Sequence, residues 1–98
     1  MIRVVMPVHL RVLGQIQGEL QLDVPPPVTQ RAIIDAIEAR YPMLAGTLRD
    51  HGSSKRRPMI RFYACNEDLS HEPPDAPVPE QVVSGREPFY VIAAIAGG

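Results

Sequence analysis

The chain has 98 residues, of which 10 are Lys or Arg and 11 are Asp or Glu, so its formal net charge at pH 7 is -1. This length fits one domain with a modest core, and the near-neutral charge argues against a general role in binding nucleic acid or anionic membranes. The single cysteine, Cys65, excludes an internal disulfide, and no apolar run approaches the roughly twenty residues that span a bilayer. No signal-peptide pattern is found, so we expect a cytoplasmic protein.

Two strands are predicted at the start of the chain. Residues 2–8 (IRVVMPV) are rich in β-branched side chains and place every second one on the same face. Residues 15–18 form a predicted turn, and residues 19–24 (ELQLDV) alternate polar with apolar side chains. The pattern predicts a β-hairpin with one solvated face. Its inward-facing side chains would be those of Ile2, Val4, Met6, Val8, Leu20, Leu22 and Val24.

One main helix is predicted over residues 30–41 (QRAIIDAIEARY). The prolines at 25–27 prevent an earlier start, Thr29 is a suitable N-cap, and Pro42 ends the helix. The apolar side chains of this segment share one stripe, opposite the charged ones. We therefore expect the helix to cover one face of a sheet. The stripe consists of Ile33, Ile34, Ile37 and Tyr41.

A third strand is predicted after a turn and a polar loop. In residues 43–50, Leu44 and Leu48 are four positions apart, as in one turn of a helix that faces a core. Residues 51–58 (HGSSKRRP) are polar. Residues 59–64 then alternate apolar and polar side chains, and residues 66–68 (NED) end the predicted strand.

The last third of the chain predicts an irregular segment and a final strand. Residues 69–79 contain four prolines, so we expect them to be extended, irregular and exposed. Residues 88–96 (PFYVIAAIA) are apolar at both sets of alternating positions. A strand of this kind is expected to be buried on both faces, at the centre of a sheet.

This order of elements predicts one α+β domain over residues 1–98, with one main helix packed across a mixed sheet, which is the β-grasp or ubiquitin-like architecture. A central last strand directs the tail, Ala96-Gly97-Gly98, away from the sheet. Glycine has no Cβ, so an extended Gly-Gly backbone fits a channel too narrow for side chains, and it reaches about 10 Å from Ala96. We expect the tail to carry the α-carboxylate of Gly98 into another protein's active site.

Several segments resemble the MoaD/ThiS family of sulfur carriers, and most closely the small subunit of molybdopterin synthase. They are residues 10–14 (LRVLG), residues 27–29 (PVT) before the helix that ends at Tyr41-Pro42, and the closing segment 82–98 with its Gly-Gly end. Two features depart from the family. Residues 85–88 are GREP where the family usually has Gly-Asp-Glu-Val, and the proline-rich connection 69–79 is longer than usual.

The resemblance implies a protein cosubstrate rather than an enzyme. An adenylating enzyme of the ubiquitin-activating type would use ATP and Mg²⁺ to convert the Gly98 carboxylate into an acyl-adenylate. Sulfur from a persulfide donor would then displace AMP and leave a thiocarboxylate. Gly98 would be the covalent site and Gly97 the residue that lets the tail thread into the partner's pocket, while this chain would bind no cofactor or metal itself.

The resemblance also implies a pathway, which is molybdenum cofactor biosynthesis. The expected sulfur acceptor is then a pterin held by a synthase large subunit. The assembly of a thiazole, of cysteine or of another thio-metabolite would use an equivalent tail, so these acceptors stay open. Two other uses of the same fold stay open as well: a ubiquitin-like modifier joined to lysines through Gly98, and a β-grasp docking module without tail chemistry.

Side chains outside the tail are weaker candidates. A thiol–imidazole pair or a metal site would have to combine Cys65 with His9, His51 or His71. The spacing of these residues along the chain matches no known ligand pattern. Cys65 also falls at the end of a predicted strand, where a small buried side chain is ordinary. The run 55–57 (KRR) lies in a polar loop, and nucleic-acid binding would need stacking aromatic residues beside it. We expect neither activity from these residues.

Overall fold

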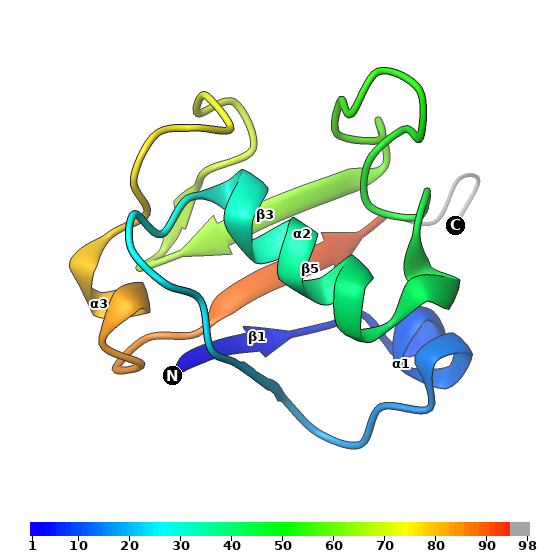
Figure 1. The fold of residues 1–98 in the computed structure, drawn as a ribbon, viewed down its shortest axis with the longest axis horizontal. Helices are drawn as coiled ribbons and strands as arrows, with labels where there is room; N and C mark the ends of the chain where they lie inside the picture. The colour runs from blue at the N-terminus through cyan, green and yellow to red at the C-terminus, as the bar shows by residue number, and fades with distance from the viewer. Residues whose placement is uncertain (95–98) are drawn as a thin grey trace.

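Five strands form one mixed sheet in the computed structural model, which describes residues 1–94 (Figure 1). The order of the strands across the sheet is β2-β1-β5-β3-β4. The strands are β1 (Ile2–Val5), β2 (Leu20–Leu22), β3 (Ile60–Ala64), β4 (Glu67–Asp68) and β5 (Phe89–Ala93). The helices are α1 (Val8–Gly14), α2 (Gln30–Arg40), the 3-10 helix η1 (Pro42–Leu44) and α3 (Glu80–Val83). None of these helices has the length and hydropathy needed to cross a bilayer.

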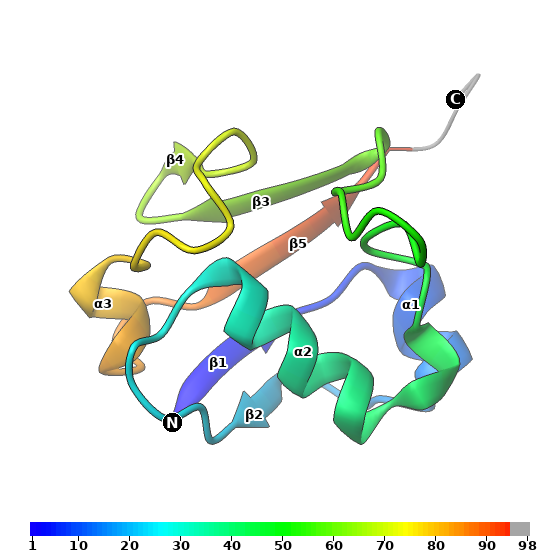
Figure 2. The same cartoon turned by 45° about the horizontal axis from the view of Figure 1, so that its top comes forward.

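The predicted layers are confirmed, because α2 packs across one face of the sheet (Figure 2). Strand β5 lies at the centre, parallel to β1 and antiparallel to β3. Alternate strand residues face the helix and form the core with it. Phe62 of β3 and Phe89 of β5 stack there, with ring centroids 5.5 Å apart, and Leu44 and Leu48 close the core after α2 as predicted.

Helix α2 begins and ends close to the residues that the sequence predicts. The hydroxyl of Thr29 accepts a hydrogen bond from the N–H of Ala32 at 3.0 Å, which satisfies a donor at the start of the helix. The helix ends at Arg40, one residue earlier than predicted, and Pro42 follows in η1. The side chains of Ile33, Ile34 and Ile37 are buried as expected, while Tyr41 is only half-buried.

Replacing Thr29 with alanine should lower the free energy of unfolding by about 1 kcal/mol, because the first turn of α2 loses its side-chain acceptor. For a domain of this size the loss corresponds to a decrease of roughly 4–8 °C in melting temperature. Thermal denaturation followed by circular dichroism measures it. Thr29→Ser keeps the hydroxyl and should retain most of the stability. If serine and alanine cost the same, the methyl group of Thr29 contributes and the cap does not.

The predicted strand over residues 2–8 is wrong beyond Val5. Pro7 lacks an N–H to continue the strand's ladder, and its carbonyl instead accepts hydrogen bonds from Leu10 and Arg11 at 3.1 and 3.0 Å. A helix, α1, therefore separates β1 from β2 in place of a direct hairpin. Val8, which was expected to face the core, is 64% exposed, and Leu10 and Gly14 are the buried residues of α1.

Residues 69–79 are irregular as predicted, but their ends are not exposed. Leu69, Ser70 and Val78 are buried. The segment folds back on the start of α2, where the N–H of Val78 donates to the carbonyl of Val28 at 2.9 Å and the carbonyl of Pro74 accepts from the N–H of Arg31 at 3.1 Å. A helix leaves its first N–H groups unpaired, so the proline-rich segment supplies an acceptor that the sequence pattern does not reveal.

Two short elements, β4 and α3, were not predicted. Cys65 and Asn66 connect β3 to β4 with φ angles of 53° and 63°, so Cys65 lies in a tight turn and not in a strand. After α3, Gly85 has a φ of 81°, and a Cβ at this position would lie 2.8 Å from the carbonyl oxygen of Met1. Glycine is therefore required where the chain turns from α3 toward β5.

Candidate functional site

The last described part of the chain leaves the sheet at the end of β5. The N–H of Ala94 donates to the carbonyl of Met59 at 2.9 Å, and the side chain of Ala94 is exposed. Because β5 and β1 run parallel, both end at the same end of the molecule, beside α1 and the loop of residues 45–58 (Figures 1 and 2). Gly97 and Gly98, the predicted site residues, lie outside the described residues, and their roles stay predictions.

The sheet face opposite α2 is apolar at its centre, which the sequence did not predict. Strand β5 was expected to be buried on both faces, but Tyr90 and Ile92 are 41% and 46% exposed. Tyr90 lies between Val5 of β1 and Tyr63 of β3, which are its partners in the sheet register. Only Phe89 and Val91 of this strand are fully buried. We call this face, formed by Val5, Tyr63, Tyr90 and Ile92, the open face.

Ion pairs border the open face on both sides. Arg3 of β1 binds Glu19 with an Nη2–Oε2 distance of 2.8 Å, and Arg61 of β3 binds Asp68 with an Nη1–Oδ2 distance of 3.3 Å. The hydrogen bonds from Arg3 hold the pKa of Glu19 below its usual value, so this carboxylate stays charged. An apolar centre with a charged rim is the usual anatomy of a protein–protein interface.

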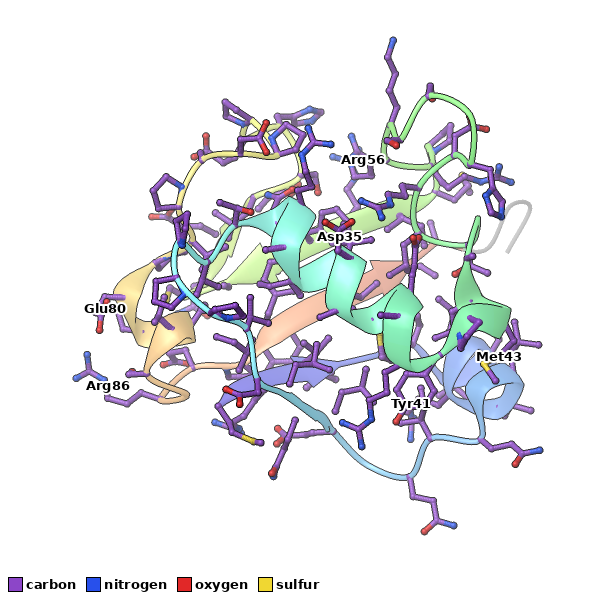
Figure 3. All side chains as sticks on the ribbon, viewed as in Figure 1. Asp35, Tyr41, Met43, Arg56, Glu80 and Arg86 are labelled. Carbon is purple, nitrogen blue, oxygen red and sulfur yellow. The ribbon has the colours of Figure 1, made fainter. Side chains whose placement is uncertain are left out.

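The loop beside the end of β5 is basic, but its three basic residues differ in role. The guanidinium of Arg56 donates to the carbonyls of Ile60 at 2.6 Å and Ser70 at 3.2 Å, so Arg56 anchors the loop to its surroundings. Arg57 lies 3.9 Å from Asp50, and Lys55 is exposed. Figure 3 shows Arg56 at the base of this loop. The run 55–57 is therefore partly structural.

Helix α1 adds a second group of exposed apolar side chains at this end of the molecule. Val12 and Leu13 on α1 are 73% and 50% exposed, and Met43 of the adjacent η1 is 52% exposed (Figure 3). The sequence did not predict this group, because the expected strand ended at residue 8, the expected turn began at residue 15, and no element was assigned between them. The spacing of the buried Leu10 and Gly14, four positions apart, is the signal that indicates a helix.

Cys65 and the three histidines do not form a metal centre in the described residues. His9 lies on α1, His51 packs against Gly46, and the ring of His71 is 3.4 Å from the guanidinium of Arg61. Within residues 1–94, no three His, Cys, Asp or Glu side chains gather in a way that would hold a metal ion. Cys65 itself is a half-buried residue of the β3–β4 turn.

Several solved structures superimpose on the whole chain. A chain of the BexX/CysO complex of Amycolatopsis orientalis has a TM-score of 0.77 and 22% identity, with 100% of both chains covered. SAMP1 of Haloferax volcanii has a TM-score of 0.75 and 14% identity, covering 98% of this chain and 97% of that one. CysO of Mycobacterium tuberculosis, described as an antigen, has a TM-score of 0.74 and 22% identity over 97% and 100%.

The fold is therefore the β-grasp. No family model and no curated protein sequence matches the chain, so the likeness lies in structure over nearly the full length and not in close sequence similarity. The central β5 and the main helix α2 packed across the sheet are the features that the β-grasp prediction required, and both are present.

Proposed function

We propose that this β-grasp protein is a sulfur carrier that acts through a thiocarboxylate on Gly98. CysO and SAMP1, which share its fold, are ubiquitin-like sulfur carriers of the ThiS/MoaD type. The observation that carries the proposal is the exit of the chain from the central strand at the exposed Ala94, four residues before Gly98. An extended run of four residues spans about 13 Å, enough to place a carboxylate in a partner's active site.

The proposed chemistry needs a partner because a carboxylate is a poor electrophile at neutral pH. A carboxylate oxygen of Gly98 attacks the α-phosphorus of ATP and displaces pyrophosphate, which gives the acyl-adenylate. A persulfide sulfur then attacks the acyl carbon and displaces AMP, which gives an acyl disulfide. A thiol reduces this disulfide and releases the thiocarboxylate. Each step takes place in the partner, and the chain supplies the reacting carbonyl and the surface that positions it.

The adenylating enzyme is expected to dock on the open face. This face continues along β5 toward Ala94, where the described chain leaves the sheet, so a protein bound there lies next to the start of the tail. Its exposed apolar centre consists of Ile92 and of Tyr90, a residue type enriched among those that dominate binding energy in such interfaces. The ion pairs at the rim would orient the partner.

Ile92→Arg should raise the KM for the carrier in the adenylation reaction at least about fivefold, because it places an unpaired charge at the centre of the docked interface. The melting temperature should change little, since Ile92 is 46% exposed. Initial rates of pyrophosphate release at varied carrier concentration measure the effect. Met43→Arg makes the same charge change at another exposed apolar residue (Figure 3). Equal effects of the two variants would contradict docking on the open face.

Intact-mass analysis of the protein, incubated with its native adenylating partner, ATP and a persulfide donor, tests the function itself. A sulfur carrier gains the mass of one oxygen-to-sulfur exchange, which fragmentation of the C-terminal peptide places on Gly98. A ubiquitin-like modifier instead appears on target lysines as a Gly-Gly remnant. A docking module shows neither change. Conjugates without thiocarboxylate, where the adenylate forms, would overturn the carrier proposal.

The proposed sulfur acceptor is a pterin in molybdenum cofactor biosynthesis, held by a synthase large subunit. This part rests on the likeness of the closing segment 82–98 to the small subunit of molybdopterin synthase. Incubation of the thiocarboxylated carrier with the large subunit and its pterin precursor should return the tail to a carboxylate and yield a dithiolene. Turnover only with an acceptor for thiazole or cysteine assembly would assign the carrier to that pathway.

A further inference from the structure

The segment of residues 66–80 is strongly acidic, and the proposed carrier role does not use it. It contains five carboxylates and no Lys or Arg. Asp68 pairs with Arg61 and Asp75 with Arg31, at 3.3 and 2.6 Å. Within residues 1–94, the side chains of the other three carboxylates form neither an ion pair nor a hydrogen bond. These three are Glu67, Glu72 and Glu80.

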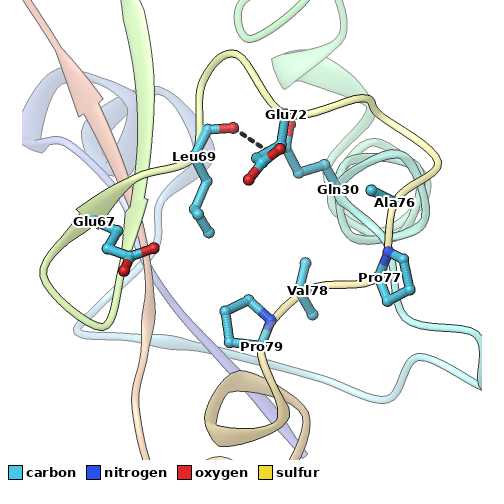
Figure 4. A pocket seen from close by; sticks show the side chains of 8 residues that line it. All are labelled: Gln30, Glu67, Leu69, Glu72, Ala76, Pro77, Val78 and Pro79. Atoms are coloured by element: carbon cyan, nitrogen blue, oxygen red, sulfur yellow. Dashed lines mark hydrogen bonds between the residues drawn. The ribbon is translucent and has the colours of Figure 1, made fainter.

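Two of the unpaired carboxylates line one cavity (Figure 4). The cavity lies between the segment 69–79, the β3–β4 hairpin and the start of α2, and its volume is about 200 Å³. Its acidic residues are Glu67 and Glu72 (Figure 4). Its other walls are largely apolar and include Leu69, Val78 and the rings of Pro77 and Pro79. The cavity thus combines an apolar lining with two negative charges that have no partner in the described chain.

A buried amide is the second observation that indicates a ligand. Gln30, at the first position of α2, lines the same cavity and is only 6% exposed. Its Nε2 donates to the carbonyl of Leu69 at 2.5 Å, which holds the amide in place (Figure 4). Its Oε1 accepts no hydrogen bond from residues 1–94. Every fully buried side-chain oxygen in these residues has a hydrogen-bond partner, so Oε1 of Gln30 must itself be accessible. The side chain of Gln30 thus presents a free acceptor that is held in place by its Nε2 hydrogen bond.

The size and charge of the cavity define its ligand. A volume of about 200 Å³ corresponds to about six or seven water molecules, which is below the range of pockets for drug-sized molecules or nucleotides. It suits one long side chain. Lys and Arg bury an apolar stem and keep a charged head at the polar end of a site, and the head would find carboxylates and an amide oxygen, all of them acceptors.

We propose that this cavity binds the basic side chain, arginine or lysine, of a partner protein. The stem packs against Leu69, Val78 and the proline rings, and the cation is held by Glu67, Glu72 and Oε1 of Gln30. The acidic segment 66–80 also attracts a basic surface over a longer range. The proposal does not depend on thiocarboxylate chemistry, so it stands or fails separately from the proposed function.

Titration of the isotope-labelled full chain by ¹H–¹⁵N NMR tests the proposal, with the capped peptide acetyl-Ala-Arg-Ala-amide as the probe. We expect saturable shifts of the backbone amides of Gln30, Leu69 and Val78, which weaken as salt is added. The same peptide with citrulline, a neutral isostere of arginine, should not saturate these shifts. Equal binding of the citrulline peptide would overturn the proposal. So would the absence of saturable shifts both with the arginine peptide and with the same peptide carrying lysine in place of arginine.

Variants locate the binding and exclude a general charge effect. Glu67→Gln with Glu72→Gln should weaken binding of the arginine peptide roughly tenfold, because two charge-assisted contacts are lost. Asp23→Asn with Glu87→Gln removes the same charge from two carboxylates outside the cavity that form no ion pair within residues 1–94, and it should leave the affinity unchanged. Equal losses of affinity in both double variants would mean that the peptide responds only to net charge, which would overturn the proposed site.

Free agmatine tests the source of the cation. If it binds as tightly as the peptide, the ligand is a small amine and not a side chain of a partner protein.

Discussion

Deletion of Gly97 and Gly98 should abolish activation by the adenylating partner and leave the melting temperature unchanged. The described core is complete without these residues, because the last buried side chain of β5 is Val91 and the last described backbone hydrogen bond is that from Ala94 to Met59. Deletion moves the terminal carboxylate back by two residues, about 6.6 Å of extended chain. Misplacement of a reacting group by 1 Å can lower the rate of its reaction about 100-fold, so we expect the rate of adenylation to fall at least that much.

ATP–pyrophosphate exchange with the native adenylating partner measures the activation step, and thermal denaturation measures stability. The matched control is Ala96→Gly, which keeps the length of the chain and the identity of its last two residues and should be activated normally. A truncated protein without a cooperative melting transition would show that the tail is structural. A truncated protein that is adenylated at the native rate would refute Gly98 as the covalent site.

Ile37→Asp should unfold the domain. Ile37 lies on the face of α2 that packs on the sheet and is completely buried. The substitution removes apolar contacts and places a carboxylate without a partner in the core, which costs several kcal/mol. The total stability of such a domain is about 5–15 kcal/mol. We therefore expect loss of the cooperative melting transition and of dispersed NMR signals.

Two further variants make the Ile37 result interpretable. Ala39→Asp places the same residue on the exposed side of α2, where helix propensity, the helix dipole and the like charge of Asp35 should together cost no more than about 2 kcal/mol. Ile37→Ala leaves a cavity and should lower the free energy of unfolding by about 2–5 kcal/mol, which a urea titration measures if the protein still folds. A fully folded Ile37→Asp protein would mean that α2 packs on the sheet through another face.

The sequence determined the elements whose signals are local. Helix α2 was predicted to within one residue because Thr29, the isoleucine stripe and Pro42 all lie within or beside it. The central place of β5 was predicted from its apolar residues at both sets of alternating positions, although one of its faces proved to be exposed. The mixed sheet with one main helix across it followed from the order of the elements. The Gly97-Gly98 tail was likewise found from the sequence, and its chemistry remains a proposal for experiment.

Only the tertiary structure decided the features that depend on which surfaces meet. The sequence pattern of a strand is the same whether its apolar side chains are covered by the domain or by a partner. The exposure of Tyr90 and Ile92 could therefore not be predicted from the alternation of apolar and polar residues. Pro7 ended β1 and allowed α1 because the helix finds its core contacts in distant residues. The cavity beside Gln30 arises where residues 69–79 meet α2, some 40 positions earlier in the chain. Hydrogen bonds and burial across such distances are set by the assembled fold, and no local pattern encodes them.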